Sequence, residues 1–253
     1  MRENFELDSL IGRSSGSVFA ATLRRCGGVL GLLVLLVACS YAPGDVANPF
    51  TRKFTWLSFL GGDDICATCR AGAPERFRLI YNGNWREQVR VYELGFSGPH
   101  SLDQRVIEPA QLFALRLEDP LGPWRGATVT AMVAEAKYEQ LVQSLAQSGA
   151  FASPSTPLTL NSTDFYWVAA SCHAGTFHLT GWLYPSEAFT RLAFPQQLLV
   201  LDTSGVVFNP PRPWSEVAPA PLGTPDNPAR GARGRTDWTI GIAQDRLVDQ
   251  TVF

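Results

Sequence analysis

Residues 77–83, Phe-Arg-Leu-Ile-Tyr-Asn-Gly, decide the fold class of this 253-residue chain. The first five alternate large apolar side chains with others, which is typical of a β-strand. The Asn82-Gly83 pair that follows tolerates positive φ angles and therefore suits a tight hairpin turn. The run 87–94 would form the returning strand, and 112–117 a third strand. This stretch therefore predicts an antiparallel sheet built from hairpins.

One main helix is predicted after the first hairpin. Its apolar stripe consists of Tyr138, Leu141, Val142 and Leu145. Gly149 stands where the end of a helix favours a left-handed residue. A second, short helix is expected after Pro185-Ser186, with Phe189 and Leu192 as its apolar residues.

Two further hairpins are predicted downstream. The first pairs 164–172 with 177–183 about a turn at 173–176, and the second pairs 198–202 with 206–208. A glycine lies in the turn of each hairpin. Runs of strands with one main helix are typical of an α+β domain built on an antiparallel sheet.

An apolar run at 27–38 follows two basic residues, Arg24 and Arg25. The run is about a dozen residues long, whereas a helix needs about 20 to cross the bilayer core. Basic residues followed by a short apolar run and small residues are typical of a secretory signal peptide. An uncleaved signal anchor is the alternative, and the length of the run argues against it.

The run ends in Leu36-Val37-Ala38-Cys39, which resembles the lipobox of bacterial lipoproteins. In that family the cysteine is thioether-linked to diacylglycerol, the signal peptide is removed just before it, and the new N-terminus is acylated, for example with palmitate. The resemblance implies lipidation at Cys39 and a periplasm-facing protein in the bacterial cell envelope. In those lipoproteins, a serine such as Ser40 favours the outer membrane over the inner one.

We expect four parts along the chain. Residues 1–38 would be the signal peptide, and 39–53, with Pro, Gly and small polar residues, a lipidated tether. Residues 54–209 would form the globular domain. The segment 210–253 is expected to be an extended or disordered tail, because it is crowded with prolines and then with arginines between glycines.

After Cys39 the chain has three thiols: Cys66, Cys69 and Cys172. Thiols beyond the inner membrane tend to pair because that compartment is oxidising. We favour a structural disulfide between Cys172 and either Cys66 or Cys69, with one thiol left over.

The same cysteines allow two alternatives. Cys66, Cys69, Cys172 and His173 are a ligand set suited to zinc, although neighbours such as Cys172 and His173 point to opposite faces of a strand. The Cys66-Ala-Thr-Cys69 spacing also fits a thiol-redox site, but glycine-rich loops rather than a βαβ unit flank it. Haem attachment is excluded because Arg70 stands where the c-type motif needs histidine.

No catalytic constellation is identified. Serine hydrolysis needs a nucleophile, a histidine and an acid, whereas His100 is expected in a loop and His178 on the polar face of a strand. Asp63-Asp64 and Glu75 are expected to serve local backbone hydrogen bonds in turns. The second hairpin contains three large aromatic residues, Tyr166, Trp167 and Trp182. At least half of them are expected to pack in the core, and the alternative is that they line a ligand surface.

A weaker resemblance concerns the mature part of the chain. A Cys-x-x-Cys loop, a hairpin and a helix that ends before Gly149-Ala150-Phe151 form an outline that is similar to an uncharacterised family of small bacterial domains found on lipoproteins. That family has no known activity, so the resemblance implies none here.

These observations favour a non-enzymatic accessory or interaction subunit that uses no cofactor. The expected partners are the membrane, through the lipid anchor, and an envelope protein. Nucleic acid is not expected, because the formal net charge is only −2. The alternative function is a periplasmic thiol-redox or metal-binding protein that uses the three thiols and His173.

Overall fold

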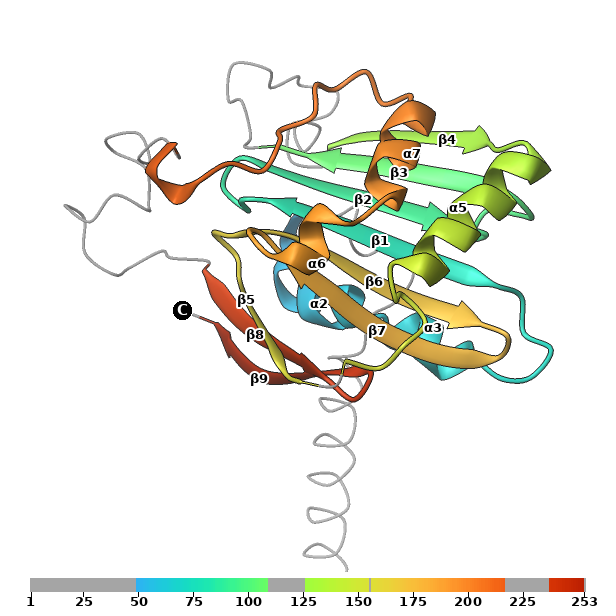
Figure 1. The fold of residues 1–253 in the computed structure, drawn as a ribbon, viewed down its shortest axis with the longest axis horizontal. Coiled ribbons are helices and arrows are strands. Elements are labelled where there is room, and N and C mark those ends of the chain that lie inside the picture. The colour runs from blue at the N-terminus through green and yellow to red at the C-terminus, as the bar shows by residue number, and fades with distance from the viewer. Residues whose placement is uncertain (1–48, 109–125, 155, 217–236, 253) are drawn as a thin grey trace, which may run out of the picture. The chain divides into compact units, whose positions relative to one another are not determined.

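The computed structural model describes residues 49–108, 126–154, 156–216 and 237–252 (Figure 1). Its helices are α2 (Pro49–Gly61), α3 (Asp63–Thr68), α5 (Glu135–Gln147), α6 (Glu187–Thr190), α7 (Phe194–Leu201) and the 3-10 turn η3 (Trp214–Glu216). Its strands are β1 (Arg76–Gly83), β2 (Gln88–Leu94), β3 (Ser101–Ile107), β4 (Ala127–Met132), β5 (Leu158–Asn161), β6 (Phe165–His173), β7 (Thr176–Leu183), β8 (Trp238–Ala243) and β9 (Arg246–Val252). Among the described helices, none is long and apolar enough to cross a membrane.

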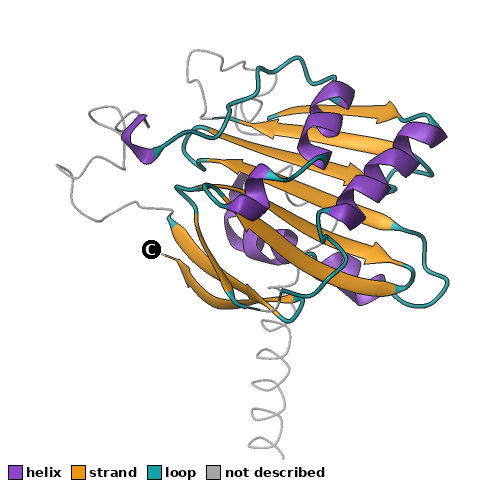
Figure 2. Cartoon of the chain, viewed as in Figure 1, coloured by secondary structure: helices purple, strands orange, loops and turns teal. Residues whose placement is uncertain are grey.

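The strands form two antiparallel sheets (Figure 2). The larger sheet has six strands in the order β4-β3-β2-β1-β6-β7, and the smaller has three in the order β5-β8-β9. Neighbours pair antiparallel in both sheets, and hairpins join β1 to β2 and β6 to β7. The predicted α+β class, with an antiparallel sheet built from hairpins, is confirmed.

Two hydrophobic cores lie on opposite faces of the six-stranded sheet. Along β1, Phe77, Leu79 and Tyr81 enter one core, whereas Ile80 enters the other, because successive residues of a strand point to opposite faces. Residues of α5 and α7 close the first core, and residues of α2, α3, β5 and β8 close the second. The central strands β1 and β6 are therefore buried on both sides.

The predicted main helix and second hairpin are confirmed. Leu141 and Leu145 of α5 are fully buried, and the chain leaves the helix through Gly149, which has a φ of 79°. Strands β6 and β7 form the second hairpin. The short helix is α6, whose N-terminus is capped because the Ser186 hydroxyl accepts a hydrogen bond from the Phe189 amide.

The tight turn predicted at Asn82-Gly83 is wrong, because both residues belong to β1 and pair with β2. The turn consists of residues 84–87, and the first of these has a φ of 61°. The buried Asn82 amide donates instead to the carbonyls of Ser162 (2.8 Å) and Asp164 (2.6 Å). Asn82 thus forms a tertiary contact with the segment before β6, and the turn preferences of its residue type do not predict such a contact.

The last predicted hairpin, 198–202 with 206–208, is also wrong. Residues Phe194–Leu201 form helix α7, with Pro195 in its first turn and Leu198 fully buried. A short apolar run without clear periodicity fits a buried strand and a buried helix equally well. The strand predicted at 112–117 lies outside the described residues, and the third and fourth strands of the sheet are β3 and β4.

The folded part of the chain begins earlier than predicted. Helix α2 starts at Pro49, inside the segment expected to be tether, and Arg52 within it is only 8% exposed.

The folded part also extends later than predicted. An extended or disordered tail is a wrong prediction for 237–252, because β8 pairs with both β5 and β9. Trp238, Ile240 and Ile242 alternate along β8 and enter the core. This alternation was visible in the sequence, but the preceding prolines suggested an unfolded tail; residues 217–236 lie outside the described part.

Residues 202–213, which we call the strap, follow α7 and are bound to the sheet by polar side chains. Arg90 of β2 is 1% exposed, and its guanidinium donates to the Asp202 carboxylate (2.5 Å) and to the Val206 carbonyl (2.6 Å). The Tyr92 hydroxyl donates to the same carboxylate at 2.6 Å. A buried arginine therefore fixes the start of the strap.

The second half of the strap is bound by the end of the first hairpin. The Asn209 carbonyl accepts from the Tyr81 hydroxyl (2.8 Å), and the Asn209 amide donates to the Gln88 side chain (3.1 Å). Arg212 donates to the Glu87 carboxylate at 2.5 Å. Side-chain bonds rather than a backbone ladder thus determine the path of the strap.

We predict that Asp202→Asn destabilises the protein by about 3 kcal/mol, because removal of one partner leaves the buried Arg90 charge uncompensated. The measurement is urea unfolding. Glu187→Gln is the matched control, since its ion pair with Arg191 is largely exposed and should contribute less than about 1 kcal/mol. Equal losses of stability in the two variants would contradict the stabilising role of the buried Arg90–Asp202 ion pair.

We also predict that this contribution depends on pH. Burial raises the pKa of the Asp202 carboxyl, but hydrogen bonds from Ser204 and Tyr92 and the charge of Arg90 outweigh it and hold the pKa below its ordinary value. Such a carboxyl stabilises the fold above its unfolded pKa of about 3.9, and the contribution is lost as the pH falls through the lower folded value. The stability difference between the wild type and Asp202→Asn should therefore shrink below about pH 4. A difference that stays constant with pH would show that the ionised Asp202 carboxylate is not its source.

Candidate functional site

Helix α3 lies against β6 because a glycine permits a close approach there. Gly62, between α2 and α3, has a φ of 70°, and a Cβ atom at this position would lie 2.5 Å from the Cβ of Ala170 on β6. Ile65 of α3 is fully buried in the core beneath. The packing brings the end of α3, with its cysteines, to the end of β6.

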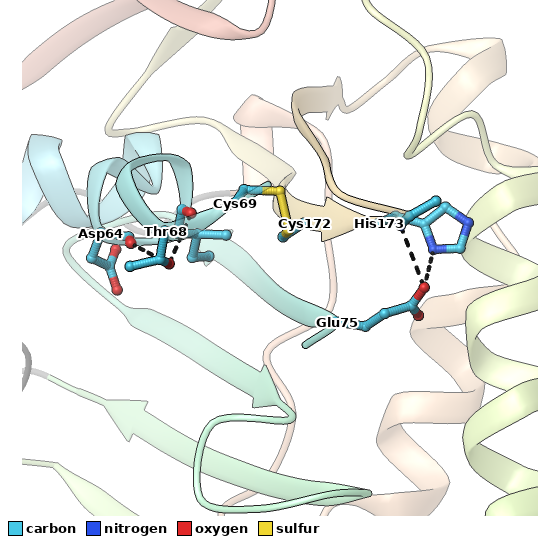
Figure 3. Close-up of a disulfide and its surroundings, with 8 residues drawn as sticks. Asp64, Thr68, Cys69, Glu75, Cys172 and His173 are labelled. Carbon is cyan, nitrogen blue, oxygen red and sulfur yellow. Dashed lines mark hydrogen bonds and ion pairs between the residues drawn. A yellow bond between two sulfur atoms is a disulfide. The ribbon is translucent and has the colours of Figure 1, made fainter. Parts of the chain in front are cut away.

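Cys69 and Cys172 form a disulfide across 103 residues of sequence (Figure 3). Cys69 directly follows α3, Cys172 on β6 is 2% exposed, and their Cα atoms lie 5.5 Å apart. Cys66, one helical turn earlier, is exposed and free. The expected disulfide is present, and the structure assigns it to Cys69 rather than Cys66.

The structure does not arrange the alternative zinc ligands around one point, because Cys69 and Cys172 are joined to each other in the disulfide. His173 points away from the disulfide, as Figure 3 shows, and its Nδ1 lies 2.9 Å from the Glu75 carboxylate. Its ring also stacks on Phe151, with ring centroids 4.1 Å apart. Within the described ranges, no group of three or more His, Cys, Asp or Glu side chains is arranged to hold a metal ion.

The free thiol lacks the feature that activates redox cysteines. Partial burial raises the pKa of Cys66, and the negative charge of Asp63 raises it further. Thiol-redox proteins of the Cys-x-x-Cys type instead lower the pKa of the attacking thiol, because the thiolate is the nucleophile. Together with the pairing of Cys69 with Cys172 rather than with Cys66, the direction of this pKa shift does not favour the redox alternative.

The acidic residues before the cysteines have a different role from the one predicted. Asp64 was expected to serve its own turn, but its carboxylate accepts two hydrogen bonds from Arg78 of β1, at 2.7 and 2.8 Å. Arg78 is 1% exposed and also donates to Glu93 (2.8 Å) and to the Phe59 carbonyl (3.0 Å). Asp63 accepts from the Ser58 hydroxyl at 2.6 Å. An arginine inside an apolar strand was the available signal for this buried ion pair.

The other residues considered from the sequence have structural roles. Tyr166, Trp167 and Trp182 are all buried, which confirms core packing for them. His178 lies 3.7 Å from the Asp245 carboxylate. His100 lies in a loop, as expected, with its ring centroid 4.7 Å from that of Tyr138.

A hollow of about 250 Å³ opens beside the disulfide. Its walls are the loop 70–74, the end of α3 at Thr68, Arg76 at the start of β1, and Cys172. Arg70 and Arg76 are the only charged residues in this lining. Sequence reasoning missed this hollow because Arg76 and Cys172 become neighbours only through the pairing of β1 with β6.

We predict that the double substitution Cys69→Ser/Cys172→Ser costs about 3 to 5 kcal/mol of stability, because a disulfide that closes a long loop restrains the unfolded chain. Cys66→Ser removes a cysteine from the same helical turn and should leave stability nearly unchanged. The measurement is denaturant unfolding of both variants under non-reducing conditions. A large loss in Cys66→Ser with none in the double variant would contradict the assigned pairing.

Comparison with protein-family models, with curated proteins and with solved structures finds no match to this chain.

Proposed function

We propose that the protein is a lipid-anchored component of the bacterial cell envelope and acts as a non-enzymatic accessory or interaction subunit. Its domain would face the periplasm, with the outer membrane favoured over the inner one by Ser40. The observation that carries the proposal is the lipobox-like Leu36-Val37-Ala38-Cys39, followed in the same chain by the Cys69–Cys172 disulfide. Disulfides persist in oxidising compartments and are rare in the cytosol.

The distance between Cys39 and the first described helix supports a role close to the membrane. Helix α2 begins at Pro49, so residues 39–48 connect it to the lipidated cysteine. A chain of this length spans at most about 35 Å even when fully extended. An anchored protein would therefore keep the start of its folded domain within this distance of the bilayer surface.

The contacts of the polar side chains in the described part are consistent with the proposal. Among the described residues, Arg78 and Arg90 are the most deeply buried charges, and they form ion pairs that hold α3 and the strap. His173 and His178 lie against carboxylates, at 2.9 and 3.7 Å. In the described part of the chain, no hydrogen bond joins a histidine to a serine or cysteine side chain, which is the contact that activates such nucleophiles.

We predict that the chain, expressed in a bacterium with the lipoprotein pathway, incorporates radiolabelled palmitate and partitions with membranes. Cys39→Ser should abolish the label and leave an unprocessed precursor, because the thiol is the attachment atom. Cys66→Ser is the matched control and should be labelled like the wild type. Equal labelling of Cys39→Ser and the wild type would overturn the proposed anchor.

A further inference from the structure

The hollow beside the disulfide is lined by two arginines that have no acidic partner among the residues that the structure describes. Five other arginines of the described part bind carboxylates: Arg78, Arg86, Arg90, Arg191 and Arg212. For Arg70 and Arg76, no ion pair or side-chain hydrogen bond is formed with any described residue. Two positive charges that are not ion-paired with any described residue thus line the hollow.

Arg76 is the clearer case of an arginine without a hydrogen-bond acceptor among the described residues. Its Nε atom is buried and has no hydrogen-bond partner among the described residues, and its guanidinium lies 5.4 Å from the centroid of the Phe96 ring. Burial of a charged donor is unfavourable unless an acceptor compensates for the lost water. The position of Arg76 therefore suits an acceptor that the described residues do not supply.

The fold holds both arginines in place. Arg76 pairs with Cys172 across β1 and β6, so both side chains emerge on the same face of the sheet. Arg70 follows Cys69 directly, and the next residue, Ala71, packs on the β6–β7 turn, where a Cβ on Gly175 would lie 2.8 Å from its Cα atom. The disulfide and this contact restrain the backbone of the loop, so the two arginines start from fixed points beside the hollow.

We propose that this hollow binds a phosphate group. A guanidinium matches phosphate oxygens with paired, charge-assisted hydrogen bonds. Two arginines complement the negative charge of the group, which is about −1.5 to −2 at neutral pH for a phosphate with a second ionisable proton and a single charge for the diester of a lipid headgroup. The volume of about 250 Å³ accommodates a headgroup-sized anion. The phosphate would come from an anionic lipid headgroup or from free phosphate, and the chemistry of recognition is the same for both.

The test uses inorganic phosphate as the probe and the full chain, purified in uncharged detergent. Titration calorimetry at constant ionic strength should show saturable binding. Arg70→Gln and Arg76→Gln should each weaken it by about tenfold, since each removes a charge-assisted contact. Arg191→Gln, an exposed arginine paired with Glu187, is the matched control and should bind like the wild type.

A second arm identifies the source of the phosphate. The Cys39→Ser chain is mixed with vesicles of phosphatidylcholine alone or with phosphatidylglycerol added. Extra binding to the anionic vesicles that both arginine substitutions remove would assign the site to lipid headgroups. Calorimetric binding without extra vesicle binding would assign it to free phosphate.

The inference fails if the folded wild type binds neither probe, or if Arg70→Gln binds phosphate as tightly as the wild type. Arg70 is exposed, so its replacement should leave the fold intact, and thermal unfolding checks this for each variant. The result is independent of lipidation, because the calorimetric arm does not use the anchor. Failure of the phosphate site and failure of the proposed lipid anchor are therefore distinguishable.

Discussion

A charged side chain on a sheet that is buried from both sides must find its partners inside the protein, and this constraint organises the molecule. Arg78 on β1 and Arg90 on β2 point to opposite faces of the six-stranded sheet and are both 1% exposed. Arg78 is neutralised by Asp64 of α3, and Arg90 by Asp202 at the start of the strap. Because an uncompensated buried charge is so unfavourable, these pairs restrict where each segment can lie. Apolar packing alone tolerates more arrangements.

Helix α3 is held at both of its ends. Asp64 in its first turn is bound to β1 through Arg78, and Cys69 just after its last turn is bound to β6 through the disulfide. Only six residues long, this helix would be marginal without such restraints. The position of the helix determines the position of the following loop, residues 70–74. This loop forms one wall of the hollow, whose two arginines have no ion-pair partner among the described residues. The structural disulfide and the candidate ligand site are therefore one assembly.

The proposed location and the proposed ligand are physically compatible. A lipid anchor would confine the domain near a bilayer surface, where phosphate groups are concentrated. An oxidising compartment would keep the disulfide closed and the loop in place. The thiol of Cys66 takes no part in this arrangement, and burial and the charge of Asp63 raise its pKa rather than lower it.

The sequence by itself determined the α+β class, the main helix and the second hairpin, because side-chain periodicity is a local property, and it favoured a disulfide to Cys172 over a metal or redox site. Only the tertiary structure decided that Asn82 lies in a strand, that 194–201 is a helix and that 238–252 adds two strands. It also decided which cysteine pairs, and that Arg76 stands beside Cys172. Each of these features depends on which residues face the segment across the hydrophobic core or on the paired strand. Such neighbours can be about 100 residues away in sequence, so the local sequence pattern does not reveal them.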